Sequence, residues 1–159
     1  MTIIKKLFSV SVAILLAGMA LGAAAQTSDK KVLNLDGARK IAAAAEAEAK
    51  KNNWNVVIAV VDDGGNLLYL QRMDGTQTGS IQVAIDKART AQAFKRPTKV
   101  FEDAIAGGRN AILGLNGALP LEGGLPVKVG EQVVGAIGVS GVTAQQDGQI
   151  AKAGADTVN

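Results

Sequence analysis

Apolar residues in the first half of the chain recur at the spacing of amphipathic helices. After Asn34, a suitable N-cap, they fall three to four positions apart up to residue 52, as one helical face requires; the positions are Ala38, Ile41, Ala42, Ala45 and Ala49. Ser80 is expected to cap a second helix, which Pro97 ends; its apolar face holds Ile81, Ala84, Ile85, Ala88 and Ala91. Because the first face is mostly alanine, we expect that helix to lie close against a sheet.

Two other parts of the chain have the pattern of paired strands. Residues 56–61 are apolar on both faces, as a central strand is, and residues 67–73 return after the turn Asp62-Asp63-Gly64-Gly65-Asn66. In a second hairpin, residues 121–141, two Val- and Ile-rich runs flank Gly130-Glu131. Glycine inside a strand often marks close approach of another backbone or a ligand, and the second run contains Gly135, Gly138 and Gly141.

The remaining segments complete a mixed fold. We expect a short helix over residues 98–106, a short edge strand at residues 111–115, and a last helix opened by the capping box Thr143-x-x-Gln146. Tight hairpins imply antiparallel pairing. No Gly-rich phosphate loop joins a strand to a helix, which excludes a dinucleotide-binding fold. The predicted class is α/β (α+β), with one antiparallel sheet of about five strands and helices packed on its faces.

The N-terminal residues have the pattern of an export signal. Lys5-Lys6 precede an apolar run from Leu7 to Leu21, and Ala23-Ala24-Ala25 fit the small-residue rule for cleavage before Gln26. The sequence therefore predicts a signal peptide over residues 1–25, a single mature domain over residues 26–159, and a periplasmic or secreted location. An uncleaved membrane anchor is the alternative, and after cleavage we expect no membrane partner.

Composition narrows the chemistry that the chain can perform. It contains no Cys and no His, which excludes disulfides, metal sites built on imidazole or thiolate, and an ordinary Ser–His nucleophile. Asp62 and Asp63 are too few acids for a calcium site, so we expect no metal. The formal charge of +3 falls to +1 when Lys5 and Lys6 leave with the signal. We therefore infer no nucleic-acid partner.

Several fragments, taken together, resemble a known family. In chain order they are Ile58-Ala59-Val60-Val61-Asp62-x-x-Gly65, Arg72-x-Asp74, Lys87-Ala88-Arg89-Thr90-Ala91, Gly123-Gly124-x-Pro126, the run from Gly135 to Gly141, and Asp147. Their order and spacing over residues 34–157 resemble the GlcG/HbpS family, also called the haem-degrading or DUF336 domain. The resemblance implies a profilin-like sandwich, assembly into a homo-oligomer, and a haem-binding-like function.

The resemblance also implies haem as a cofactor, and the iron of haem needs a ligand. His and Cys, two of its usual protein ligands, are absent. The mature chain retains one Tyr and one Met, Tyr69 and Met73, which share a face of the strand over residues 67–73. They are the candidate axial ligands. The alternative is that both are ordinary core or surface residues, since alternate positions of any strand share a face.

Two of the matched fragments contain candidates for binding a carboxylate. Arg72, with Asp74 two residues on, could hold a ligand carboxylate or a haem propionate bidentately; the alternative is an exposed ion pair. Lys87 and Thr90 share a helical face and could also meet a ligand carboxylate; the alternative is a solvated rim beside the alanine stripe.

The two ends of the second hairpin are candidates for binding an anion. Glu122-Gly123-Gly124 and Ser140-Gly141 could together form a nest of backbone N–H groups. The helix that starts after Thr143 would add the positive end of its dipole nearby. The alternative is that these residues serve turn formation alone.

Three functions remain open from the sequence. The preferred one is an exported haem-binding-like protein that binds haem or another small carboxylated ligand, in haem or iron handling or sensing. The second is an enzyme acting on a small organic acid, with Lys87, Arg72, Asp74 or Glu122 as acid–base groups. The third is an oligomeric partner module without catalysis.

Overall fold

The computed structural model describes residues 28–158. The helices and strands of the described residues lie in the compact unit that begins at Lys31; they are α2 (Leu35–Lys51), β1 (Val57–Asp62), β2 (Leu67–Arg72), α3 (Ser80–Phe94), α4 (Lys99–Ala106), the 3-10 helix η1 (Asn110–Gly114), β3 (Gly124–Val129), β4 (Gln132–Ser140) and α5 (Ala144–Ala155). The predicted signal peptide lies outside the described residues. No helix within residues 28–158 is long and apolar enough to cross a membrane.

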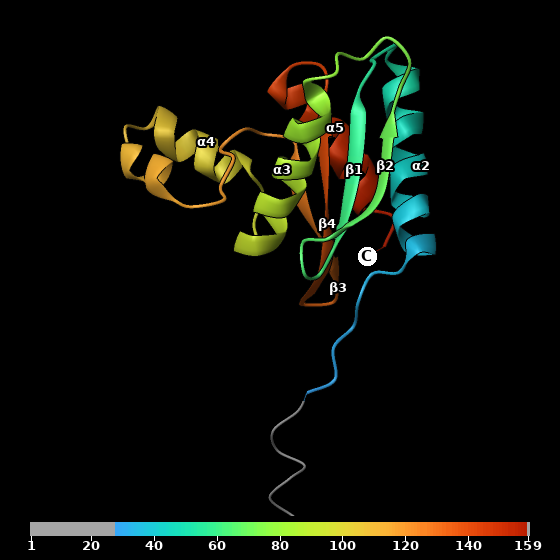
Figure 1. Ribbon diagram of the computed structural model, residues 1–159, viewed down its shortest axis with the longest axis horizontal. Helices are drawn as coiled ribbons and strands as arrows, with labels where there is room; N and C mark the ends of the chain where they lie inside the picture. The colour runs from blue at the N-terminus through green and yellow to red at the C-terminus, as the bar shows by residue number, and fades with distance from the viewer. Residues whose placement is uncertain (1–27, 159) are drawn as a thin grey trace, which may run out of the picture. The chain divides into compact units, whose positions relative to one another are not determined.

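The strands form one sheet in the order β2-β1-β4-β3, with every neighbouring pair antiparallel (Figure 1). Both predicted hairpins are present, and the antiparallel α+β class is confirmed. The expectation of about five strands was wrong, because the described sheet has four. The predicted edge strand at residues 111–115 is instead η1, in which the Ile112 and Leu115 N–H groups donate to carbonyls three residues earlier. A short apolar run does not distinguish a strand from a helical turn by periodicity alone.

Helices cover both faces of the sheet. Helices α2 and α5 pack over one face, and α3 packs over the other (Figure 1). Successive strand residues point to opposite faces, so Ile58 and Val60 contact the α2–α5 layer while Val57 and Ala59 lie beneath α3. Since β1 is covered on both faces, it is apolar from Val57 to Val61, as its sequence predicted.

The two faces differ in the size of their side chains. Branched aliphatic residues fill the α2–α5 side, whereas alanine and glycine dominate beneath α3. A Cβ added to Gly138 would lie only 2.0 Å from the Ala84 carbonyl oxygen of α3, and one added to Gly124 would lie 2.4 Å from the Lys87 carbonyl oxygen. The close approach predicted for Gly138 is therefore made by the backbone of α3, which approaches Gly124 in the same way.

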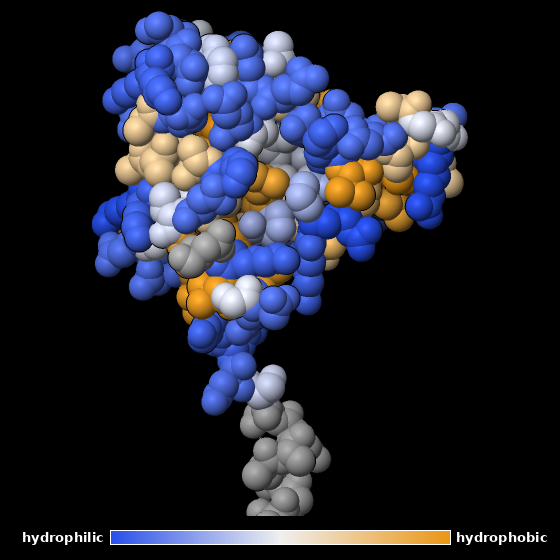
Figure 2. Space-filling model, turned by 180° about the vertical axis from the view of Figure 1, so that it is seen from behind, coloured by the Kyte–Doolittle hydropathy of each residue, from blue (hydrophilic) through white to orange (hydrophobic). Residues whose placement is uncertain are grey.

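Helices α4 and η1, together with the intervening turn and Leu115, form an arm that projects from the sandwich (Figure 1). We use "the arm" for residues 99–115. Several of its large apolar side chains are exposed, including Val100 at 46% and Leu113 at 67%. Figure 2 shows apolar surface on this projection, bordered by hydrophilic surface. The arm thus leaves several large apolar side chains uncovered by the rest of the chain.

Candidate functional site

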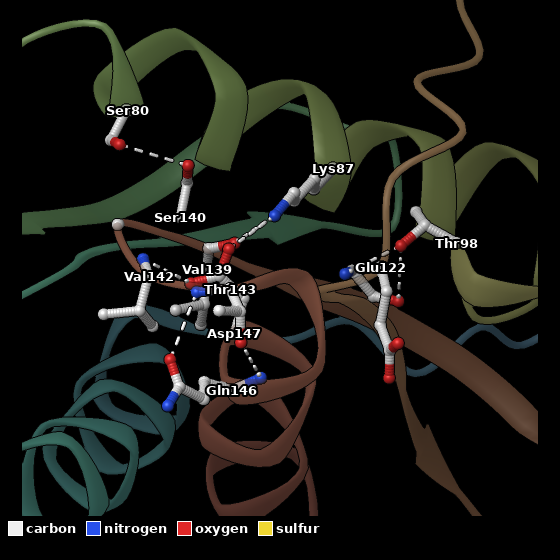
Figure 3. Close-up of polar contacts among 12 residues, drawn as sticks. Ser80, Lys87, Thr98, Glu122, Val139, Ser140, Val142, Thr143, Gln146 and Asp147 are labelled. Carbon is white, nitrogen blue, oxygen red and sulfur yellow. Dashed lines mark hydrogen bonds and ion pairs between the residues drawn. The ribbon is translucent and has the colours of Figure 1, made fainter. Parts of the chain in front are cut away.

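Two charged side chains of the described residues are buried, and they form an ion pair. Lys87 extends from α3 and Asp147 from α5, with Lys87 Nζ 2.8 Å from Asp147 Oδ2 and each side chain 3% exposed. Lys87 Nζ also donates to the Val139 carbonyl oxygen at 2.9 Å (Figure 3). Because α3 and α5 cover opposite faces of the sheet, this ion pair joins the two helical layers beside the start of β3.

Gly123 makes room for the ion pair. Its φ is +122°, and an added Cβ would lie 2.8 Å from Lys87 Nζ and 2.8 Å from Asp147 Cβ. A side chain here would strain the backbone, because L residues rarely adopt such a φ. It would also displace the ammonium group. Gly123 is therefore needed for the packing of the Lys87–Asp147 pair.

One N–H group of the predicted nest, that of Gly141, is already taken by an anion that belongs to the chain. Asp147 Oδ1 accepts a hydrogen bond from the Val142 N–H at 3.2 Å, and the Gly141 N–H also bonds to this carboxylate. Burial raises the pKa of the Asp147 carboxyl, while Lys87 and the two N–H groups oppose that shift. The carboxylate thus takes the place at Gly141 that the sequence suggested for a ligand.

The N–H groups before β3 are likewise bonded within the chain. Thr98 Oγ1 accepts a hydrogen bond from the Gly124 N–H at 2.9 Å, and the Glu102 carboxylate accepts one from the Glu122 N–H. Thr98 immediately precedes the arm, and Glu102 lies in the first turn of α4. The segment 122–124 therefore anchors the arm to the sheet.

Glu122 itself remains partly exposed and lies against α5, since a Cβ on Gly148 would be 2.6 Å from Glu122 Oε1. Burial raises the pKa of the Glu122 carboxyl. The Lys99 ammonium opposes the shift, and the neighbouring Glu102 and Asp103 carboxylates add to it. Glu122 is thus a predicted site residue whose carboxyl group is accessible to solvent and has a raised pKa.

Two predicted hydroxyl ligands are buried and already hydrogen-bonded. Thr90 Oγ1 accepts from the Leu119 N–H at 2.8 Å and donates to the Asp86 carbonyl oxygen at 2.7 Å, which fixes the loop after η1 to α3. Ser140 Oγ lies 3.2 Å from Ser80 Oγ. The prediction that Ser80 caps α3 was wrong: it is the first helical residue, and no side chain caps the helix.

Arg72 and Asp74 lie elsewhere, at the β2 edge of the sheet. They line a polar cavity of about 390 Å³ together with Glu46, Lys50, Asn55, Gln71 and Met73. In the strand order β2-β1-β4-β3, strand β1 separates Arg72 from β4, which Lys87 contacts. The structure therefore does not bring Arg72 and Lys87 together in one site.

The two candidate haem ligands are half-buried on the α2–α5 side. Tyr69 and Met73 both pack against the core of that face, and the Tyr69 hydroxyl donates to Gln71 Oε1 at 3.3 Å. Within the described residues no other Tyr or Met is available as an iron ligand. Both lie on the face of the sheet opposite to α3, the helix that carries Lys87.

Sequence reasoning missed the partner of Lys87. Asp147 lies in the first turn of α5, where an acid is ordinarily explained by the helix dipole. A signal was present, because Ile150 and Ala151 follow it on the buried face and an acid on such a face requires a partner. Pairing it with Lys87, 60 residues earlier, required the tertiary structure.

A family comparison identifies the fold to which this site belongs. The model of the family described as haem degrading protein HbpS-like matches residues 33–156. The chain belongs to the HbpS-like family. This confirms the resemblance drawn from the sequence fragments.

Relatives and solved structures agree with this assignment. The HbpS-like chain is 48% identical to protein GlcG of Escherichia coli strain K12 over 111 residues, which cover 70% of this chain and 83% of GlcG. A double mutant of HbpS from Streptomyces reticuli superposes with a TM-score of 0.77 at 34% identity, covering 85% of this chain and 92% of that one. PduOC in its complex with haem has a TM-score of 0.72 at 26% identity, covering 80% and 96%.

Proposed function

We propose that this HbpS-like protein is an exported binding protein that takes haem or another small carboxylated ligand, in haem or iron handling or sensing. The observation that carries the proposal is the family match over residues 33–156. The similarity to PduOC, whose solved complex contains haem, supports it. Fold alone does not determine function, so the proposal also has to agree with the residues of this chain.

Those residues fit the carboxylates of haem better than its iron. The chain has no His and no Cys, and Tyr69 and Met73 are half-buried against the core. Arg72 is exposed in the polar cavity at the β2 edge and offers a donor for a propionate. Iron is left to Tyr69, Met73, a lysine or water. We therefore expect binding weaker than that of a His-ligated site, without a bis-His spectrum.

A haem titration followed by absorbance tests the proposal. It uses the mature wild-type protein and the variants Tyr69→Phe, Met73→Leu and Arg72→Ala. A saturable change that is lost in one of the first two variants identifies an iron ligand. A change lost only in Arg72→Ala indicates propionate capture without a protein ligand.

Absence of any saturable change in the wild-type protein would overturn haem as the ligand. The lack of His would then be the physical reason. Isothermal titration with small organic acids would next decide whether another carboxylated ligand is bound.

A second candidate function, an enzyme acting on a small organic acid, is favoured by Glu122. Its carboxyl is partly exposed and has a raised pKa because of burial, which suits a general acid or base. The test is incubation of the mature protein with a panel of small organic acids and analysis by mass spectrometry. Turnover that Glu122→Gln abolishes supports the enzyme, and no product from the wild-type protein rejects it.

Export is part of the proposal and rests on residues 1–25. The charged pair Lys5-Lys6, the apolar run and Ala23-Ala24-Ala25 support cleavage before Gln26. Intact-mass measurement of protein from the native host should give a species that begins at Gln26, found in the periplasm or medium. A full-length cytoplasmic species would contradict export.

Assembly into a closed homo-oligomer is also proposed. Large apolar side chains are exposed outside the arm, among them Val32 at 60% and Leu67 at 43%, and closed symmetry is the common way to cover such surfaces. Light scattering of the mature protein should give more than one chain per particle. A monomer at micromolar concentration would exclude a stable oligomer.

A further inference from the structure

A groove formed by the arm and the end of α3 combines apolar walls with two guanidinium groups. It has a volume of about 390 Å³ and runs between α4 and η1; its lining is Phe94, Arg96, Val100, Phe101, Ala104, Arg109, Ala111, Ile112 and Leu115. This volume lies within the range of small-molecule sites, which are typically apolar with a few placed polar groups. None of the site residues predicted from the sequence lies in it.

The apolar walls of the groove are held in place by aromatic packing. The rings of Phe94 and Phe101 meet edge to face with their centroids 5.2 Å apart, an arrangement that aromatic pairs prefer. Phe101 is 4% exposed and Ile112 is 8% exposed, so the floor is fixed, whereas Leu115 at the side is 39% exposed. The floor is therefore preformed and the open side is accessible to a ligand.

The two guanidinium groups have no acidic partner in the part of the chain that the structure describes. Neither Arg96 nor Arg109 takes part in any of the ion pairs among those residues, and both are exposed. Arg96 is positioned, because its Nε donates to the Phe94 carbonyl oxygen at 3.1 Å and its guanidinium lies 5.9 Å from the centre of the Phe101 ring. Its terminal nitrogens are left for an anion.

A second cavity adds positive charge beside the groove. It also has a volume of about 390 Å³ and shares Arg96 with the groove; the cations that line it are Lys95, Arg96, Lys128 and Lys152. Lys152 is paired with Asp156 at 2.6 Å. The other three cations have no acidic residue as a partner among the residues that line this cavity. The charge around Arg96 thus favours an anionic ligand.

We propose that the groove between α4 and η1 binds an amphipathic carboxylate, with its apolar body on Phe101 and Ile112 and its carboxylate on Arg96 and Arg109. Apolar walls alone would accept neutral ligands, and guanidinium groups alone would accept any anion. Their combination selects molecules that have both parts. The inference deepens the proposed function, because this ligand is its small carboxylated ligand. It does not depend on an iron ligand.

The test uses matched probes with the mature protein. The fluorescent anion 8-anilinonaphthalene-1-sulfonate should bind saturably and more tightly than the neutral N-phenyl-1-naphthylamine. Octanoate should displace the anion, and 1-octanol should not. Arg109→Gln should weaken binding of the anion about tenfold, as loss of a charge-assisted hydrogen bond does, and should leave the neutral probe unchanged.

Two further variants make the result specific to the groove. Leu115→Gln should weaken both probes, because it makes the open wall polar. Arg39→Gln is the matched control, since Arg39 is an exposed arginine paired with Asp36 on α2; it should change neither. Circular dichroism of each variant checks that the fold is retained.

Three outcomes would overturn the inference. The first is equal affinity of the two probes, the second is an anion affinity that Arg109→Gln leaves unchanged, and the third is a groove closed to both probes because a second copy of the chain covers it. Failure of the haem titration with retained, Arg109-dependent octanoate binding would reject haem and keep the groove. Saturable haem binding without octanoate binding would keep haem as the ligand and reject the groove.

Discussion

Two regions of the molecule contain cationic side chains, and they differ in what neutralises the positive charge. At the end of the sheet, Lys87 is buried and bonded to Asp147 and to the Val139 carbonyl oxygen. At the arm, Arg109 and the neighbouring Arg96, which precedes α4, are exposed beside an apolar groove, without an acidic partner in the described residues. The first region holds an anion supplied by the chain, and the second has room for one from outside.

This difference separates a structural charge from a charge that can recognise a ligand. A buried ammonium needs a partner at all times, because burial of an unpaired charge is costly. An exposed guanidinium is solvated and can exchange water for a ligand at low cost. The residue type is therefore a poor guide to function, and the supply of internal partners is a better one.

The largest effect is expected from removing the internal anion. Asp147→Ala leaves Lys87 buried without its counter-ion, which should lower the free energy of unfolding by about 3–5 kcal/mol. Urea denaturation of the mature protein measures it. If Lys87 instead served a ligand site, the loss of stability would be below about 1 kcal/mol, as for an exposed pair.

A double variant sharpens this result. Lys87→Met with Asp147→Leu removes both charges and keeps apolar volume, and it should recover most of the lost stability, since a buried ion pair is often replaceable by apolar residues. The difference between the double and the single variants gives the coupling energy. Absence of recovery would mean that the pair itself stabilises the fold.

The next effect compares glycines in the two regions. Gly138→Ala places a Cβ 2.0 Å from the Ala84 carbonyl oxygen and should cost about 3 kcal/mol of stability through overpacking. Gly114→Ala, the control on the arm, places its Cβ where nothing lies within 4 Å and should be neutral or slightly stabilising. Thermal unfolding of both variants measures the contrast. Equal destabilisation would mean that the arm is as closely packed as the sandwich.

The hydrophobic pattern was sufficient to predict most of the sandwich. The stripe from Ala38 to Ala49 and the apolar run of β1 are properties of local sequence, and their burial follows from periodicity. The glycines of the second hairpin predicted a close approach, but only the structure shows that the approaching group at Gly138 is the backbone of α3. A glycine in a strand thus indicates from local sequence that another group packs closely there, but it does not indicate which group.

The site was less predictable, because it depends on pairs that are distant in sequence. Lys87 and Thr90 were recognised as polar residues beside an alanine stripe, but their partners Asp147 and Leu119 lie on other elements. The arm was also not predicted from the sequence. Residues 111–115 have too few positions to separate a strand from a 3-10 turn, and Arg109 lies in a loop without any periodic signal.

The smallest effect on stability is expected from the carboxylate of Asp62, which lies outside both regions. Burial raises the pKa of Asp62, but hydrogen bonds from Asn66, Gly64 and Gly65 outweigh it, so the net pKa is lowered. The folded state then binds fewer protons than the unfolded state. The stabilisation from Asp62 is present above the unfolded pKa near 3.8, and it is lost as pH falls through the folded pKa.

Unfolding at a series of pH values checks this expectation. Asp62→Asn should flatten the decrease in stability below about pH 4 and should leave binding of octanoate unchanged at neutral pH. An acid decrease that is the same in the variant and the wild-type protein would show that other carboxylates cause it.

The most direct test of the comparison is a chemical-shift titration of the ¹⁵N-labelled mature protein with octanoate. The account predicts saturable shifts at the amides of Arg96, Arg109 and Ile112, with those of Lys87, Val139 and Val142 unmoved. Saturable shifts at Val139 and Val142 with an unaffected arm would contradict it, because the ligand would then compete with Asp147 for the charge that we assign to the fold.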